Sequence, residues 1–254
     1  MTDIKLTNRK KLRHRWSHQL WIHRYAVRFV NAVMRLVPFS IKYGVGSWLR
    51  RNEYPYKLLN ERSVVVQIGA PVDTLGCGRS RAMHFSLLTR KGKAVIIEPD
   101  AASEKMFGKL GAKHGLTNIN FCPVGAWSES KQLKLYVNKA HPATNFTEGT
   151  VEYDESRLRE YDVYHVPVDS VDNILSAKGI GHVDLISITT NGSERHILQG
   201  MEMAMNSGTK YVCLAGTGEE YVELMGEYGY GLLAYDDRGF TFQRNETGER
   251  KQAA

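Results

Sequence analysis

The sequence predicts an α/β fold, a doubly wound and mostly parallel sheet preceded by an N-terminal helical arm. Short apolar runs alternate with segments of helical periodicity along most of the chain, as expected when helices cover a parallel sheet. The first run, at residues 64–68, meets Gly69 and a glycine-containing loop, and a helical segment follows. The next run ends at Glu98. This order of strand, glycine loop, helix, strand and acid is typical of the opening of a nucleotide-binding α/β unit.

Basic residues are concentrated near the N-terminus. Residues 1–62 hold 14 Lys and Arg against 3 Asp and Glu, which leaves 20 of the 34 basic and 24 of the 27 acidic residues in the rest of the chain. We therefore expect a basic helical arm over 1–62 and a single Rossmann-like domain over 63–254. The slight acidity of this larger domain argues against a nucleic-acid partner, which would select a basic groove.

The cysteines indicate a reducing compartment. Cys77, Cys122 and Cys213 are scattered, odd in number and without a C-x-x-C pair, so neither a disulfide framework nor a zinc ribbon is expected. The basic residues before position 16 are not followed by the apolar core of a secretory signal. His14 and His18 are spaced i, i+4 but lack an acidic third ligand, and we expect no metal. These features favour a cytoplasmic protein.

The arm contains a basic amphipathic segment at residues 16–37, which Pro38 ends. Charged residues interrupt it too often for a membrane span. Its apolar side could pack on the domain or on a second subunit in a homodimer. Alternatively, residues 9–37 could contact the anionic inner face of a membrane. Residues 41–59 form a connector with some helical character.

The remaining pattern predicts alternating elements. Gly115 stops one helix, and Asp169 is a candidate cap for another. The polar stretch 139–162 is either a lid over a site or a solvated insertion. Strands are expected at 64–68, 94–97, 118–122, 132–137, 164–168, 183–188, 211–215, 232–235 and 240–244, and helices at 81–89, 101–114, 170–178, 194–206 and 219–228.

Polar or glycine-rich groups follow four of the predicted strands. In an open parallel sheet, ligands bind beyond the carboxyl ends of the strands, so these groups should converge. Glycine lets the backbone approach a ligand, and a carboxylate such as Glu98 can accept both hydroxyls of a ribose. The four groups are residues 67–70, 98–100, 124–127 and 189–192.

These blocks resemble the FkbM family of S-adenosylmethionine-dependent methyltransferases. The resemblance covers about residues 64–212, in the family's order, and implies a class I methyltransferase fold. It also implies O-methylation, often of a hydroxyl on a sugar, glycan, lipid or natural product. The matching blocks are VVVQIGA, VIIEPD, NINFCPVGAWSESKQLKLYV, VPVDSVDNIL and VDLISITTNGSERHILQGM.

By position, the resemblance assigns parts of an S-adenosyl-L-methionine site. Gly69 and Ala70 would border the methionine part, and Glu98 would hold the ribose hydroxyls. The adenine would lie between the residues at 125–127, where an aromatic ring can stack on a purine. The full expected cofactor set is Gln67, Gly69, Ala70, Gly76, Glu98, Pro99, Gly125, Ala126, Trp127 and Thr189.

The chain departs from the family at several charged positions. Gln67 stands where the family has an acid, and the loop after it is longer. The late motif K-I-D-x-E-G-x-E reads SITTNGSE here, so Thr189 and Asn191 replace two acids and Ser187 replaces the lysine. Thr and Asn can hydrogen-bond a ligand, but neither is a base at neutral pH.

Methyl transfer needs an aligned acceptor oxygen and a group to take its proton. His141, Glu194 and then Asp100 are the candidate bases, and Asn191 is included in the catalytic set. Asn145 and Thr190 are candidates for binding the acceptor.

Two other classes of protein remain open. The missing acids suit a cofactor-binding pseudoenzyme or scaffold that docks through its basic arm. An NAD(P)-dependent oxidoreductase would need a tighter G-x-G-x-x-G loop directly after the first strand, which residues 69–78 do not supply.

Overall fold

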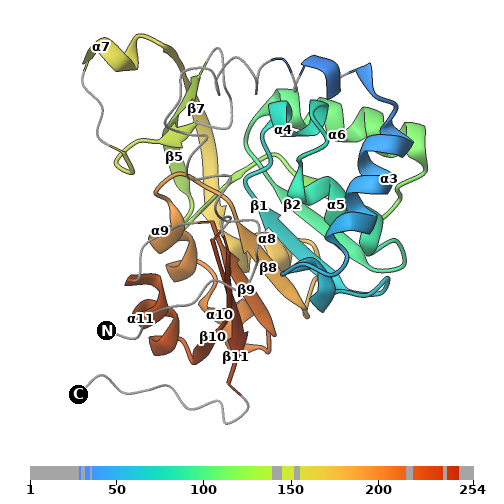
Figure 1. Ribbon diagram of the computed structural model, residues 1–254. Coiled ribbons are helices and arrows are strands. Elements are labelled where there is room, and N and C mark those ends of the chain that lie inside the picture. Colours follow the sequence, from blue (N-terminus) through green and yellow to red (C-terminus); the bar gives the residue numbers. More distant parts are fainter. Residues whose placement is uncertain are drawn as a thin grey trace.

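The computed structural model describes residues 29, 32–34, 36–138, 145–151, 155–215, 220–236 and 239–245 (Figure 1). Most of the arm's predicted helix at 16–37 lies outside these residues, although 32–34 and 36 are helical. No helix in the described ranges is both long and apolar enough to cross a membrane.

A seven-stranded sheet forms the centre of the molecule, in the order β10-β11-β9-β8-β1-β2-β3. The strands from β3 to β9 are parallel, whereas β11 runs antiparallel to both of its neighbours. The predicted α/β class is therefore confirmed, with a mixed sheet in which parallel pairing dominates. The strands are β1 (Val64–Ile68), β2 (Lys93–Ile97), β3 (Ile119–Cys122), β8 (Leu185–Ile188), β9 (Tyr211–Leu214), β10 (Tyr230–Asp236) and β11 (Gly239–Arg244).

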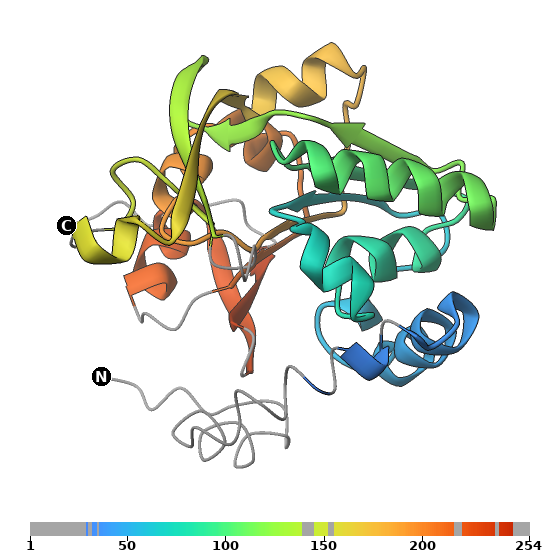
Figure 2. The ribbon, with the colours of Figure 1, turned by 90° about the horizontal axis from the view of Figure 1, so that it is seen from above.

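Helices cover both faces of this sheet. Successive strand residues point to opposite sides, so Val65 packs with Phe85 of α5 while Val66 packs with helices of the other face. One face carries α5 (Arg81–Leu88) and α6 (Ala101–His114). Figures 1 and 2 show this separation. The other face carries α8 (Val171–Ala177), α9 (Glu194–Gln199), α10 (Glu202–Asn206) and α11 (Glu220–Glu227).

A second sheet, in the order β4-β7-β5-β6, takes up strands that the sequence pattern placed in a single sheet. β5 and β7 pair antiparallel along their lengths, from Lys131 opposite Val168 to Asn138 opposite Tyr161. Residues 162–165 of β7 are all exposed, so both faces of the sheet reach water at this end, because successive strand residues point to opposite faces. Its elements are β4 (Gly125–Trp127), β5 (Lys131–Asn138), β6 (Phe146–Thr147), β7 (Tyr161–Ser170) and the short α7 (Glu155–Leu158) before β7.

Two predicted segments have different boundaries because of local packing. The helix expected at 194–206 breaks into α9 and α10 at Gly200, where a Cβ atom would lie 1.9 Å from the Trp127 carbonyl oxygen. The loop at 70–78 contains a short helix, α4 (Val72–Gly76). The cap of α8 is Ser170, whose Oγ accepts from the Asn173 N–H at 3.1 Å, and not Asp169.

The connector packs against the α/β domain through α3 (Phe39–Arg50) and the 3₁₀ turn η1 (Tyr56–Leu58). Tyr43 of α3 is fully buried and donates to the Leu75 carbonyl at 2.8 Å. Ser47 hydrogen-bonds the buried His84 of α5 at 2.8 Å. These contacts hold α3 against α4 and α5.

All three cysteines are buried and none is disulfide-bonded. Cys77 ends α4, whereas Cys122 ends β3 and Cys213 lies in β9. Burial raises the pKa of the Cys122 thiol, and it raises the pKa of Cys213 to about 11.

Candidate functional site

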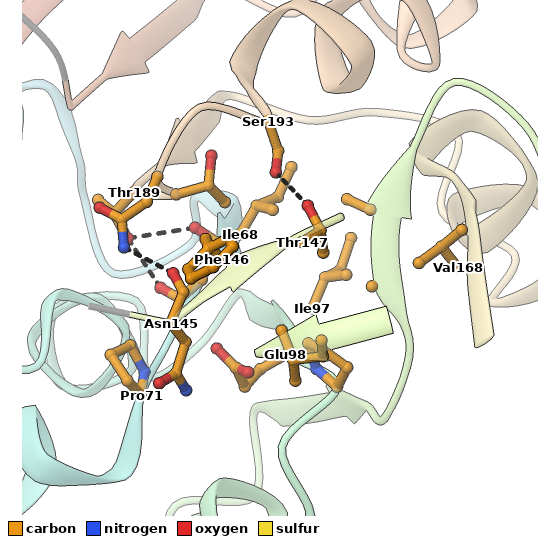
Figure 3. A pocket seen from close by; sticks show the side chains of 17 residues that line it. Ile68, Pro71, Ile97, Glu98, Asn145, Phe146, Thr147, Val168, Thr189 and Ser193 are labelled. Carbon is orange, nitrogen blue, oxygen red and sulfur yellow. Dashed lines mark hydrogen bonds between the residues drawn. The ribbon is translucent and has the colours of Figure 1, made fainter. Parts of the chain in front are cut away.

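A pocket of about 610 Å³ lies where the carboxyl ends of β1, β2 and β8 meet the second sheet (Figure 3). This is the edge at which parallel sheets bind ligands. The lining residues are Ile68, Gly69, Pro71, Ile97, Glu98, Pro99, Gly125, Ala126, Leu135, Asn145, Phe146, Thr147, Val168, Thr189, Thr190, Asn191 and Ser193.

At the end of β1, the backbone turns at Gly69 with φ of +80°. A Cβ atom there would lie 2.4 Å from the Thr189 carbonyl oxygen, so only glycine lets the β1 and β8 loops approach so closely. Gln67 is buried behind this contact, and its Nε2 donates to the Gly69 carbonyl at 2.9 Å and to Thr189 Oγ1 at 2.8 Å. Gln67 therefore supports the pocket and does not line it.

At the end of β2, the Glu98 carboxyl group is 7% exposed and faces the pocket (Figure 3). One oxygen accepts from the Ala70 N–H at 2.6 Å and the other from the Asp100 N–H at 3.1 Å. Loss of water around the carboxyl group raises its pKa from its usual 4.5 to about 7, against the lowering effect of these two bonds. Glu98 is thus an acceptor already oriented by the backbone, and its remaining lone pairs can take ligand hydroxyl groups.

An apolar wall stands opposite the polar end of the pocket. Leu135, Phe146 and Val168 come from the second sheet, and Ala126 is next to them in β4. Gly125 keeps β4 close to β7, because a Cβ atom there would lie 2.8 Å from Val168 Cγ1. Such a wall suits a flat, weakly polar ring.

The turn after β8 is held by its own hydrogen bonds. Thr189 Oγ1 donates to the Gly69 carbonyl at 2.8 Å, and Asn191 Nδ2 donates to the Asn145 carbonyl at 2.7 Å. Ser193 Oγ is 3.0 Å from Thr147 Oγ1, which ties this turn to β6 (Figure 3). The late turn, residues 189–194, therefore connects the two sheets.

Thr190 and Glu194 form a hydroxyl–carboxyl pair. Thr190 lines the pocket, and its Oγ1 donates to Glu194 Oε1 at 3.0 Å. Glu194 is only 3% exposed, and burial raises the pKa of its carboxyl group. Glu194 reaches the pocket through Thr190 and does not line it.

The pocket brings together most of the residues singled out in the sequence, namely Gly69, Glu98, Pro99, Gly125, Ala126, Asn145, Thr189, Thr190 and Asn191. His141 and its neighbours at 139–144 lie outside the described residues. Asp100 is occupied as the cap of α6, where its carboxylate accepts from the Ala102 and Ser103 N–H groups.

Other predicted residues lie outside the pocket lining. Gly76 belongs to α4, and its carbonyl accepts from Lys42 Nζ at 2.9 Å. Trp127 is buried and stacks on His196 of α9 with ring centroids 4.0 Å apart. Ala70 contributes through its N–H to Glu98.

Sequence reasoning missed the apolar wall and the Thr190–Glu194 pair. Strand alternation over 132–137 predicted a strand, observed as β5, but not which sheet that strand would join. Helical spacing could not have revealed this pair, because α9 begins only at Glu194 and the chain turns at Gly192, with φ of +87°, between the two residues. In the described part of the chain, no three His, Cys, Asp or Glu residues group closely enough to hold a metal ion.

Comparisons with known proteins give matches among solved structures alone. No protein-family model and no curated protein matches the chain. Among solved structures, the crystal structure of methyltransferase FkbM from Methylobacillus flagellatus KT aligns at 13% identity with a TM-score of 0.48. The alignment covers 76% of this chain but 46% of that one, so less than half of that structure has a counterpart here. At this level the similarity shows neither family nor function.

Proposed function

We propose that the chain is an S-adenosylmethionine-dependent methyltransferase that methylates a hydroxyl oxygen of a sugar, glycolipid or natural-product acceptor. The observation that carries this proposal is Glu98, a buried carboxyl group bonded to the N–H of the glycine loop, which faces a pocket with an apolar wall. A carboxyl group that accepts hydrogen bonds from hydroxyl groups suits a ribose, and an apolar wall suits an adenine. The pocket therefore matches the two parts of one nucleoside.

The strand order favours a methyltransferase over an NAD(P)-dependent oxidoreductase. In the dinucleotide-binding order, the sixth strand lies directly beside the fifth. Here β11 runs antiparallel between β9 and β10, so the strand order departs from the dinucleotide-binding order at this edge. Pro71 also lines the pocket where a pyrophosphate would need N–H donors, and proline has none.

The pocket residues divide into three binding groups. Glu98 accepts from the ribose hydroxyls, and the wall around Ala126, Leu135 and Phe146 covers the adenine. Gly69 and Thr189 border the methionine part. When bound, the cofactor supplies a sulfonium methyl group, whose carbon–sulfur bond breaks as the carbon–oxygen bond to the acceptor forms and a neutral thioether leaves.

Thr190 and Glu194 take up the proton that the acceptor hydroxyl group loses. The Thr190 hydroxyl accepts the proton of the acceptor and passes its own proton to the Glu194 carboxylate, 3.0 Å away. The raised pKa of Glu194 makes its carboxylate a stronger base than an exposed one, because base strength follows pKa. His141 remains the second candidate base, from outside the described residues.

Calorimetric titration of the purified full chain with S-adenosylmethionine and with NAD tests the cofactor. We expect S-adenosylmethionine binding that Glu98→Gln weakens by about 10- to 100-fold, since an amide group replaces one acceptor oxygen with an NH₂ donor. Glu61→Gln, at an exposed carboxylate paired with Lys91, is the matched control and should bind normally. Tight NAD binding without S-adenosylmethionine binding would overturn the proposal.

A cofactor-binding protein without catalysis is the second candidate. It is favoured by the late turn, where Thr189 and Asn191 replace acids and are engaged in hydrogen bonds to the neighbouring loops. Transfer of labelled methyl groups into a cell glycolipid extract separates the two. We expect transfer by the wild type and a loss of about 100-fold in Thr190→Val, with Thr190→Ser active. Cofactor binding without any transfer would leave only the binding role.

A further inference from the structure

A second cavity adjoins the pocket and carries two arginines. Its volume, open mouth included, is about 740 Å³, and it shares Gly69, Pro71, Thr189, Thr190 and Asn191 with the first pocket. Its own wall includes Arg79 and Arg81, from the loop before α5 and the first residue of that helix. Thr190, whose hydroxyl group is proposed above to take the acceptor proton, is among the residues that line both.

The two guanidinium groups are not neutralised by the described part of the protein. No lining residue of this cavity is a carboxylate, and no ion pair to Arg79 or Arg81 is found among the described residues. Arg81 is half-buried and donates to the neutral Ser187 Oγ, at 3.2 Å. The first turn of α5 also lacks an acidic residue, so the positive end of this helix adds to the same field. A half-buried cation without a counter-charge is costly, which a bound anion would offset.

We propose that the acceptor carries a phosphate or carboxylate group, which Arg79 and Arg81 bind while the acceptor's hydroxyl group lies at Thr190. This inference rests on the proposed methyltransferase function and adds the substrate class, an anionic hydroxyl compound. Planar guanidinium groups bind phosphate and carboxylate groups alike, through paired N–H donors. Sugar phosphates and sugar acids could therefore bind at the same two arginines.

Binding of small probes to the full chain with S-adenosylhomocysteine tests the anion site. Saturation-transfer NMR would compare glucose 6-phosphate, glucuronate and neutral glucose. We expect both anions to bind about tenfold or more tightly than glucose, and the double variant Arg79→Gln/Arg81→Gln to lose this preference. Arg62→Gln, at an exposed arginine before β1, is the matched control and should keep it.

The outcomes separate this inference from the function beneath it. Arg79→Gln alone changes an exposed side chain, so it tests the site even if the Arg81 variant unfolds. If S-adenosylmethionine binds but no anion is preferred, or if Arg62→Gln weakens anion binding equally, the anion site is wrong and the methyltransferase stands. If S-adenosylmethionine does not bind the wild type, the function itself fails.

A different observation concerns the outer face of α3. Ile41, Val45, Trp48 and Leu49 fall on one side of this helix and are each more than half exposed. Trp48 is 70% exposed, and Leu36 just before the helix is 86% exposed. Soluble surfaces seldom expose such a continuous apolar stripe.

We infer that this stripe docks on an anionic membrane surface. The charge next to it in the described chain is complementary, because residues 36–62 hold five basic and two acidic residues. Apolar and aromatic side chains with nearby Lys and Arg are typical of helices that lie in a membrane interface. The stripe also lies opposite the side of α3 that Tyr43 buries against the domain.

Vesicle sedimentation with the full chain tests this docking. We expect binding to vesicles of phosphatidylcholine with phosphatidylserine, little binding to phosphatidylcholine alone, and about a tenfold loss in Trp48→Glu. Met203→Glu, at a 62% exposed methionine on α10, is the matched control and should bind normally. Equal binding of Trp48→Glu would contradict the docking, as would a wild-type dimer in solution that Trp48→Glu dissociates.

Discussion

The ends of β2 and β8 border the same pocket with opposite polar chemistry. At the end of β2, Glu98 is an acceptor whose nearest backbone partners, Ala70 and Asp100, are N–H donors. At the end of β8, Thr189 and Asn191 act as donors, and their partners are the carbonyl oxygens of Gly69 and Asn145.

This difference explains where the chain keeps a carboxylate. An ionised carboxylate has no proton to donate, so it is stable beside N–H groups and unstable beside carbonyl oxygens. In this chain the end of β8 faces carbonyl oxygens. The Thr189 hydroxyl and the Asn191 amide donate hydrogen bonds to them, which an ionised acid could not do. Thr189 and Asn191 therefore suit these two positions better than the acids that the sequence resemblance implied.

The largest expected effect concerns the pH dependence of stability at the β2 end. The folded chain holds Glu98 protonated up to about pH 7, whereas the unfolded chain ionises it near 4.5, so the folded state binds more protons between these values. Stability contributed by this group is thus full below pH 4.5 and falls as pH rises, by about 3 kcal/mol near pH 7. Urea unfolding at several pH values should show a flatter profile for Glu98→Gln.

Glu61→Gln is the control, since its exposed carboxylate should leave the wild-type profile unchanged. An identical slope in Glu98→Gln and in the wild type would mean that Glu98 does not titrate in this range. The polar groups at the ends of β2 and β8 would then differ less in their chemistry than their hydrogen bonds indicate.

A smaller effect tests the contact between the β1 loop and the β8 loop. Gly69→Ala combines an unfavourable positive φ with a Cβ atom 2.4 Å from the Thr189 carbonyl oxygen, and should cost about 2–3 kcal/mol of unfolding free energy. Gly149 has the same φ of +80°, but the space that a Cβ atom would take there is open, so Gly149→Ala should cost only about 1 kcal/mol. Chemical denaturation of both variants isolates the steric part, and equal losses would show that the loops can separate freely.

The smallest effect concerns the donors of the β8 end. Thr189→Val keeps the shape of the side chain but removes the hydroxyl that bonds the Gly69 carbonyl and accepts from Gln67, at a cost of about 1–2 kcal/mol. Thr189→Ser keeps these bonds and should stay within about 0.5 kcal/mol of the wild type. Thermal unfolding measures both, and a stable Thr189→Val would show that the hydroxyl is not needed.

The sequence predicted best what depends on neighbouring residues. Gly69 and Glu98 were expected at one edge of the sheet and lie there, because each directly follows an apolar strand and the carboxyl ends of parallel strands share one edge. The helix at 101–114 was predicted correctly to its Gly115 stop, because the left-handed φ of 64° there favours glycine.

Long-range packing explains what the sequence pattern did not reveal. Alternation identified β5 and β7 as strands but contains no information on which sheet they join, so the second sheet and the apolar wall were missed. Trp127 follows a strand end as a ligand-stacking residue would, yet its ring turns toward His196 because α9 packs against β4. The break at Gly200 has the same origin, since it is set by the distant Trp127 carbonyl.

The reactivity of the three buried cysteines can also be used to measure local opening of the protein. Thiol reagents attack the thiolate, and burial both hides these sulfur atoms and raises the pKa values of Cys122 and Cys213. Cys77 lies at the end of α4, Cys122 at the end of β3 and Cys213 within the large sheet. The alkylation rate of each cysteine therefore measures how often a different part of the molecule opens. Cys213 should react only when the central sheet itself opens.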